Sequence, residues 1–217
     1  MMAVEQEAPA RLAVIAPAPG RLELVRAFVN TLDIEAGTDE LSSPAALATW
    51  LRERDLAGSP PSPATEAELS QAIEMREAIR EVLLTHLSRQ HHPASAPATS
   101  TPATSTTVAP GPTASTLAKL RSSAAGLSTR LTITDDGMVQ TMPAGRGTAY
   151  GLAALMLIAA DASASGTWQR LKVCSADDCR WAFYDRSPTR SGCWCSMAVC
   201  GSRAKSRAFR RRAAGDL

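Results

Sequence analysis

The stretches Cys174-Ser-Ala-Asp-Asp-Cys179 and Cys195-Ser-Met-Ala-Val-Cys200 decide the fold of the C-terminal part of this chain. Each stretch places two cysteines on either side of four residues, and fifteen residues separate the two pairs. Four thiolates complete the tetrahedral shell of a zinc ion, which is the usual arrangement of a structural rather than a catalytic site. The spacing therefore predicts one structural zinc ion with the ligands Cys174, Cys179, Cys195 and Cys200.

A fifth cysteine, Cys193, competes with Cys195 for one ligand position. Only Cys195 repeats the four-residue gap of the first pair, so we expect Cys193 to be a spare thiol, with an exchange of the two ligands as the alternative. Ordinary buried cysteines and a disulfide pair are the other interpretations. All five cysteines lie within 27 residues, and no signal peptide is visible at the start of the sequence. This distribution favours metal binding over a secreted disulfide framework.

A basic run follows the last cysteine and extends from Gly201 to Arg212. From Trp168 onward the chain has eleven Lys and Arg residues against four Asp and Glu residues, whereas the preceding part has twelve against seventeen. This charge difference favours an anionic partner for the C-terminal end. The spacing predicts a helix whose inner face, towards the metal, carries Met197, Cys200, Ala204 and Ala208.

Arginines at helical spacing form the outer stripe of this expected helix. Guanidinium groups suit phosphate oxygens and guanine edges, and an α-helix fits the major groove, so we expect double-stranded DNA as the partner. A solvated tail or an anchor on an acidic protein surface is the alternative. The candidate DNA-binding residues are Arg203, Lys205, Arg207, Arg210, Arg211 and Arg212, with Arg186 and Arg190 from the loop between the cysteine pairs.

Apolar periodicity predicts a mainly helical region before the cysteines. Ser43 before Pro44, and Thr65 three residues before Glu68, are typical helix starts. Alternation around Asp136-Gly137 predicts a β-hairpin with strands at 130–134 and 138–142. The helices that we expect here lie at residues 21–32, 44–58, 65–90, 117–125 and 146–162, followed by an extended strand at 168–173.

These elements predict a mainly α-helical protein with a small β-hairpin. Residues 1–20 are expected to form a flexible arm. Residues 21–167 are expected to form a helical domain, in which a Pro-, Ala-, Ser- and Thr-rich flexible insertion occupies 91–116. Residues 168–217 are expected to form a small zinc finger, treble-clef-like or ribbon-like, with a basic C-terminal helix.

The cysteine region resembles the CGNR-type zinc finger, whose Cys-Gly-Asn-Arg signature is matched by Cys200-Gly-Ser-Arg203. The N-terminal part is similar to the ABATE domain that accompanies this finger, through Phe28-Val-Asn-Thr-Leu32 and a Leu-x-x-Trp-Leu-like element at 47–51. The resemblance implies a stress-related bacterial transcription regulator with a DNA-binding finger. Two positions depart from the family pattern: Ser202 replaces the usual Asn, and Cys193 stands where a basic residue is common.

No catalytic pattern appears outside the cysteines, so we expect a protein that is not an enzyme. The second hypothesis is an interaction module, in which the helical domain binds a small molecule or protein effector and the finger is purely structural. The most apolar stretch, residues 150–160, is expected to be too short to span a bilayer. We therefore expect a cytoplasmic protein with no membrane contact.

Overall fold

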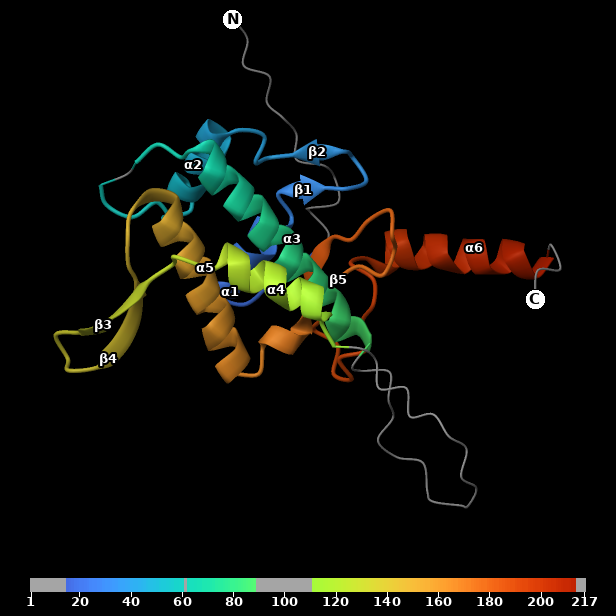
Figure 1. Cartoon of the computed structure of the whole chain (residues 1–217). Helices are drawn as coiled ribbons and strands as arrows, with labels where there is room; N and C mark the ends of the chain where they lie inside the picture. The colour runs from blue at the N-terminus through green and yellow to red at the C-terminus, as the bar shows by residue number, and fades with distance from the viewer. Residues whose placement is uncertain (1–14, 61, 89–110, 214–217) are drawn as a thin grey trace, which may run out of the picture.

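The structure is a computed structural model that describes residues 15–60, 62–88 and 111–213. Helices dominate it, and the strands form three small antiparallel two-stranded sheets (Figure 1). The helices are α1 (Leu22–Val29), α2 (Pro44–Arg52), α3 (Glu66–Ser88), α4 (Ala114–Ser123), α5 (Gly147–Ala164) and α6 (Ser202–Ala213). The strands are β1 (Leu32–Asp33), β2 (Thr38–Asp39), β3 (Thr129–Ile133), β4 (Val139–Pro143), β5 (Leu171–Val173) and β6 (Ala182–Tyr184). The expected mainly α-helical class is confirmed.

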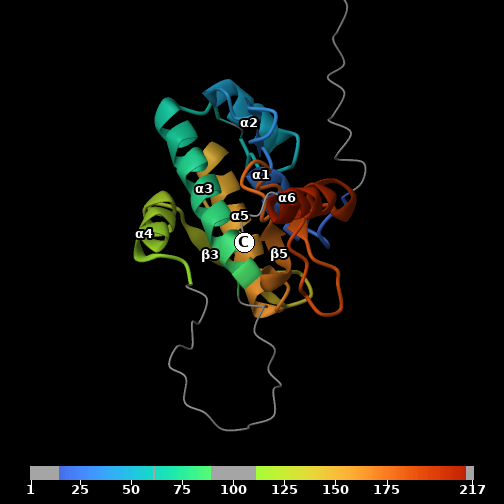
Figure 2. The ribbon, with the colours of Figure 1, turned by 90° about the vertical axis from the view of Figure 1, so that its right-hand side faces the viewer.

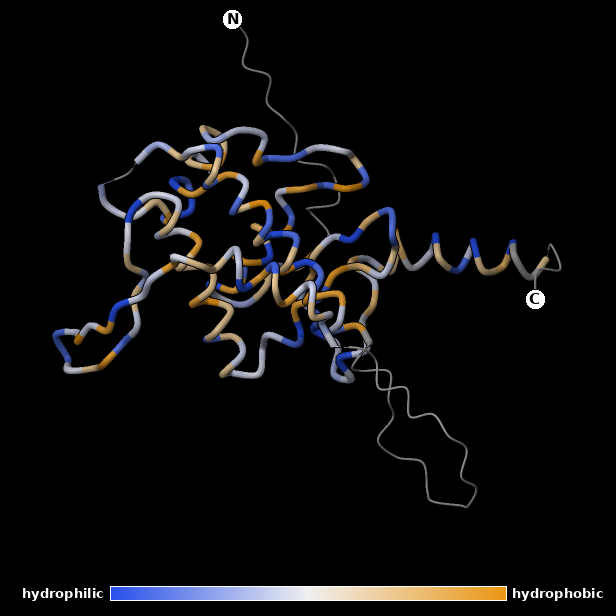
Figure 3. Tube along the Cα trace, in the orientation of Figure 1, coloured by the Kyte–Doolittle hydropathy of each residue, from blue (hydrophilic) through white to orange (hydrophobic). Residues whose placement is uncertain are grey.

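The main core lies between α1, α2, α3 and α5, whose apolar faces meet in the body of the protein. The β3–β4 hairpin and α6 project from opposite sides of this body (Figure 1). In the view turned by 90°, α6 points towards the viewer and α4 lies along α3 (Figure 2). Hydrophobic residues gather along the helices of the body and alternate with hydrophilic ones along α6 (Figure 3).

The helix caps that the sequence predicts are present in the structure. The Ser43 hydroxyl accepts the amide of Ala46 at 3.1 Å, and Pro44 is the first residue of α2. Ahead of α3, the amide of Thr65 donates to the Glu68 carboxylate at 2.8 Å, and the amide of Glu68 donates back to the Thr65 hydroxyl at 3.2 Å. This reciprocal pair is the capping box that the sequence predicts. The β3–β4 hairpin is also confirmed, with Ile133 opposite Val139.

Several boundaries differ from the expectation: α2 ends at Arg52 and not at 58, and α1 ends at Val29, so that Leu32 lies in β1. Ala18 is buried and Ile15 packs beside the cysteines, so the described end of the expected arm is held against the protein. Helix α4 begins at Ala114 with Thr113 as its cap, inside the region 91–116 that was expected to be flexible; residues 91–110 lie outside the described part. The expected strand at 168–173 begins as a 3-10 turn, Trp168–Arg170, and only β5 is extended.

Helix α5 is longer than the apolar stretch that the sequence suggested. It has 18 residues and is long and apolar enough to cross a membrane by length and composition alone, whereas the apolar stretch 150–160 covers only its central part. Most of its side chains are buried, including Leu152, Leu155 and Ile158, and it packs against α1, α2 and α3. Its position in the core accounts for its composition without a membrane.

The cysteine-containing region is fastened to the helical body by buried polar side chains. The Asn30 side chain, which directly follows α1, forms two hydrogen bonds with the backbone of Ala182 in β6. Its amide nitrogen donates to the Ala182 carbonyl at 2.9 Å, and its oxygen accepts the Ala182 amide at 2.7 Å. Asn30 thus acts as a substitute for a third strand at the edge of β6, and it pairs backbone groups that would otherwise be buried without partners.

Helix α3 supplies two further contacts to the same region. The Arg80 guanidinium donates to the carbonyl of Arg180 at 2.9 Å and also to the carbonyl of Val29 at the end of α1. Further along the helix, His86 Nδ1 lies 2.8 Å from the carbonyl of Leu171 in β5. Because a carbonyl only accepts, Nδ1 carries the proton. The body therefore holds both β5 and the turn that follows it through directed hydrogen bonds.

An ion pair fixes the β1–β2 hairpin to α3. The buried Arg76 guanidinium donates to both carboxylate oxygens of Asp39, at 2.7 and 2.9 Å, and to the Thr31 hydroxyl at 3.1 Å. Burial opposes the ionisation of Asp39, but the hydrogen bonds from Arg76 and from the amide of Leu41 hold the pKa of this carboxyl below its ordinary value. The hairpin that carries Glu35 is therefore held in a fixed place.

We expect Asn30→Ala to lower the free energy of unfolding by about 2–4 kcal/mol, because it leaves the amide and the carbonyl of Ala182 buried without partners. Urea denaturation at saturating zinc measures the change. Thr141→Ala is the matched control, since Thr141 is exposed on β4, and it is expected to have little effect. A loss below about 0.5 kcal/mol for Asn30→Ala, within the usual range for surface substitutions, would contradict this role.

Candidate metal centre and basic helix

The first cysteine pair lies on a tight turn between β5 and β6. These strands pair antiparallel, with Val173 opposite Ala182, and the amide of Cys174 extends the ladder by donating to the carbonyl of Trp181 at 2.9 Å. The amide of Cys179 donates to the carbonyl of Ala176 at 3.0 Å. The turn brings both sulfur atoms to the same side.

The second pair lies where the chain enters α6. Cys195 precedes a short π-helical turn, Met197–Gly201, and Cys200 lies within it. Ser196 organises this turn, because its hydroxyl accepts the amide of Val199 at 3.3 Å and its carbonyl accepts the amide of Gly201 at 3.1 Å. A short hairpin that carries one pair, followed by a helix that begins at the other, is a treble-clef-like arrangement.

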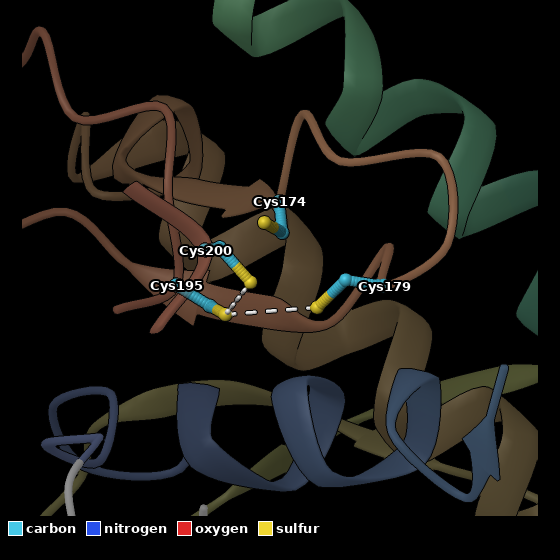
Figure 4. A group of neighbouring side chains, drawn as sticks. All are labelled: Cys174, Cys179, Cys195 and Cys200. Atoms are coloured by element: carbon cyan, nitrogen blue, oxygen red, sulfur yellow. Dashed lines mark hydrogen bonds between the residues drawn. The ribbon is translucent and has the colours of Figure 1, made fainter. Parts of the chain in front are cut away.

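The four sulfur atoms converge on one point (Figure 4). All lie within 4.8 Å of one another, and the Cys195 sulfur is 3.7 Å from the sulfurs of Cys179 and Cys200. Sulfurs bound at about 2.3 Å around a tetrahedral zinc ion lie about 3.8 Å apart, whereas a disulfide would bring two sulfurs to about 2.05 Å. The spacing fits a zinc site with four cysteine ligands, and the five cysteines form no disulfide.

The electrostatics of the cluster favour a bound cation. Hydrogen bonds from the thiols of Cys179 and Cys195 lower the pKa of Cys174 to about 2. The same hydrogen bond to Cys174 raises the pKa of Cys179 to about 12, and the pKa of Cys195 is raised by its hydrogen bonds with both. One thiolate is thus stabilised while further ionisation is opposed. A divalent cation removes this opposition and allows all four groups to ionise.

Cys193 lies outside the group of four converging sulfurs. Its side chain is half-buried, and this burial raises the pKa of its thiol. Its backbone carbonyl accepts the amide of Ser175 at 2.9 Å. The residue therefore joins the two halves of the region through its main chain, next to the first cysteine pair.

A buried ion pair, which sequence reasoning missed, shapes the loop between the cysteine pairs. Lys172 is 1% exposed and its ammonium lies 2.8 Å from the Asp185 carboxylate. It also donates to the carbonyls of Arg190 and Gly192, while Asp185 accepts the amide of Gly192 at 2.8 Å. Burial opposes ionisation of Asp185, but the hydrogen bonds from Lys172 and Ser187 keep its pKa low. The sequence signal that could have predicted this ion pair is a lysine between two apolar residues of a strand.

Helix α6 carries three of the expected DNA-binding arginines on one side. Arg203, Arg207 and Arg210 line a shallow groove of about 600 Å³ together with Ser202 and Ser206. Two of these arginines are paired: Arg203 Nη1 lies 2.9 Å from the Glu35 carboxylate, and Arg207 Nη1 lies 3.5 Å from that of Asp178.

The remaining candidates lie in different settings. Lys205 and Arg210 are exposed on α6, and neither forms an ion pair within the part of the chain that the structure describes. Arg186 donates to the carbonyl of Pro17 at 2.7 Å and lies over the Tyr184 ring, so it is tied to the N-terminal segment. Arg190 is exposed in the same loop. The side chains of Arg211 and Arg212 are not among those that the structure describes.

The prediction that one face of the last helix points inward is only partly correct. Cys200 is buried, but Met197 is 59% exposed, and Ala204 and Ala208 are half-buried. The reason is that α6 leaves the body at once and packs mainly against its own first turn.

Two family models match this chain, one over the finger and one over the helical body. A model described as the CGNR zinc finger matches residues 170–213, and the ABATE model, described as "Putative stress-induced transcription regulator", matches residues 22–165, which is more than half of the chain. The chain belongs to the ABATE family. The expected order, an N-terminal ABATE domain before a CGNR finger, is confirmed, and no curated protein matches the chain.

Two family elements acquire physical roles in this ABATE protein. In the element Phe28 to Leu32, Phe28 is fully buried, Asn30 holds β6, and the Thr31 hydroxyl accepts from Arg76. In the signature of the finger, Ser202 replaces Asn, and its hydroxyl donates to the carbonyl of Met197 at 3.2 Å. Ser202 therefore closes the turn that contains Cys200, so this substitution leaves the turn hydrogen-bonded.

We expect one zinc ion per chain by elemental analysis of the purified protein. Replacing Cys174 or Cys200 by Ser is expected to release the ion, because three thiolates leave the shell open. Cys193→Ser is the matched control and is expected to retain one ion per chain. Loss of zinc from Cys193→Ser with retention in Cys195→Ser would show that Cys193 is the ligand instead.

Proposed function

We propose that this protein is a zinc-dependent transcription regulator that binds double-stranded DNA through α6. The observation that carries the proposal is the placement of this helix. It projects from the body (Figure 1), and Lys205, Arg207 and Arg210 are exposed on it, while its first turn belongs to the four-cysteine cluster. The family description, a regulator with a zinc finger, supports a nucleic-acid partner.

The zinc ion, held by Cys174, Cys179, Cys195 and Cys200, has a structural role in this proposal. Four protein ligands leave no open position for a substrate or an activated water. Bound zinc ties the β5–β6 turn to the start of α6 and so fixes the direction in which the helix leaves the finger. The protein is therefore proposed to act by binding and not as an enzyme.

The dimensions and charges of α6 suit the major groove. Its twelve residues make a helix about 18 Å long, and B-DNA admits one α-helix in a groove about 12 Å wide. Arg203, Arg207 and Arg210 would contact phosphates or base edges, with Lys205, Arg211 and Arg212 beside them. Arg186 and Arg190 would add phosphate contacts from the loop between the cysteine pairs.

The two ion pairs of α6 are compatible with this use. Both pairs are partly exposed, with Arg203 at 40% and Arg207 at 44%, and exposed pairs contribute little to stability. Phosphates can therefore replace the carboxylates of Glu35 and Asp178 at small cost. Without DNA, these carboxylates keep the two arginines in place on the helix.

An interaction module is the second candidate function. The exposed Phe209 side chain (69%) lies on α6 beside Lys205 and Arg210, and an aromatic ring within a basic surface also suits an acidic protein partner. In that case the finger would be purely structural, and an effector, small molecule or protein, would act on the ABATE domain. We favour DNA as the partner, and with it a cytoplasmic location, because the matching family is described as a transcription regulator.

A salt titration of DNA binding separates the two candidates. The zinc-loaded protein is expected to bind duplex DNA with an affinity that falls steeply with salt. The double variant Arg207→Gln/Arg210→Gln is expected to bind more weakly and to reduce the slope of log K against log salt by about 1.8, or about 0.9 per lost phosphate contact. Fluorescence anisotropy with a labelled duplex measures both quantities.

Arg121→Gln/Arg130→Gln is the matched control, because it removes the same charge from exposed positions on α4 and β3. It is expected to retain the wild-type slope. Zinc content is measured for every variant, so that a damaged finger is recognised. No duplex binding at moderate salt, or the same slope for the α6 variant and the wild type, would refute DNA binding by α6 and favour the interaction module.

A further inference from the structure

A cavity of about 240 Å³ lies where α2 meets the beginning of α5. It belongs to the ABATE domain, and none of its lining residues comes from the finger. In Figure 1 the start of α5 lies beside α2. The lining residues are Ala48, Leu51, Arg52, Ala57, Ser62, Pro63, Gly147 and Thr148.

One end of this cavity is built from hydrogen-bond donors. Helix α5 has 18 residues, its N-cap residue Arg146 provides no side-chain hydrogen bond, and its first turn has no acidic residue. The amides of this turn therefore receive no acceptor from these side chains, and the helix dipole adds a partial positive charge. Gly147, with φ of 53°, lies against Ser62, whose hydroxyl would be 2.2 Å from a Cβ at this position.

A buried polar side chain at the same end has no partner among the described residues. Thr148 is 2% exposed and lines the cavity, and its hydroxyl makes no hydrogen bond there. Arg52 also lines the cavity; its only hydrogen bond in that part of the chain is to the Thr49 hydroxyl at 3.3 Å, and it forms no ion pair there. The Thr148 hydroxyl, which is not wholly closed off from solvent, and the exposed guanidinium of Arg52 can both donate to an acceptor in the cavity.

The rest of the wall is apolar and is formed by Ala48, Leu51, Ala57 and Pro63. A lone hydrated anion would leave these side chains unused. The volume is below the range of about 300–1,000 Å³ that is typical of pockets for drug-sized molecules. The space therefore suits a ligand with one anionic group and a short hydrocarbon part.

We propose that this cavity binds a small aliphatic carboxylate. The carboxylate accepts from the amides at the start of α5, from the Thr148 hydroxyl and from Arg52, and the hydrocarbon part packs between α2 and Pro63. As an effector site of a regulator the cavity rests on the function proposed above, but binding itself does not depend on DNA. A failure here and a failure of DNA binding are thus distinguishable.

Calorimetry on the zinc-loaded full chain without DNA tests the proposal. The probes are acetate, propionate and butyrate, with butyramide as the uncharged analogue and inorganic phosphate as the anion without a hydrocarbon part. Affinity is expected to rise from acetate to butyrate, by up to about fourfold per added CH₂. Butyramide and phosphate are expected to bind at least tenfold more weakly than butyrate.

Variants locate the site. Thr148→Val keeps the volume and removes the hydroxyl, so it is expected to weaken butyrate binding about fivefold; Arg52→Gln is expected to weaken it about tenfold. Arg121→Gln on α4 is the matched control and is expected to bind like the wild type. In amide NMR spectra, butyrate is expected to shift Gly147 and Thr148, and these shifts show binding even if a variant is unstable.

Three outcomes would overturn the proposal. The first is equal affinity for butyrate and butyramide, which would show that the charge is not recognised. The second is unchanged butyrate affinity in folded Thr148→Val and Arg52→Gln. The third is the absence of any shift at Gly147 and Thr148 at saturating butyrate, which would place the ligand elsewhere or show that none binds.

Discussion

Four cysteine sulfur atoms within 4.8 Å of one another impose the constraint on which the C-terminal part depends. Their hydrogen bonds stabilise one thiolate and oppose further ionisation, so the cluster favours a divalent cation that compensates all four charges. Because Cys195 precedes the first turn of α6 and Cys200 lies within it, the contacts that hold this cation also fix where the basic helix starts. The same contacts therefore determine both metal binding and the direction of α6.

The finger has a defined position because the ABATE domain holds its backbone directly. Asn30 pairs with β6, and Arg80 and His86 from α3 bind the carbonyls of Arg180 and Leu171. The ion pair between Arg76 and Asp39 fixes the hairpin whose Glu35 meets Arg203 on α6. These buried hydrogen bonds therefore fix the position of the finger against the ABATE domain.

Local signals predicted much of this structure. The cysteine spacing, the Ser43 cap and the capping box at Thr65 involve neighbours within a few residues, and the structure has the features that they predict. The contact of Asn30 with Ala182 spans 152 residues and leaves no periodic trace in the sequence. The exposure of Phe209 likewise has no local signal in the sequence, since it depends on α6 leaving the body.

X-ray absorption at the zinc edge tests the central claim most directly, because it reports which atoms surround the metal in the intact protein. The account predicts a single shell of four sulfur atoms at about 2.3 Å, without nitrogen or oxygen neighbours. A shell with three or fewer sulfurs, completed by nitrogen or oxygen, would contradict a closed site built from Cys174, Cys179, Cys195 and Cys200.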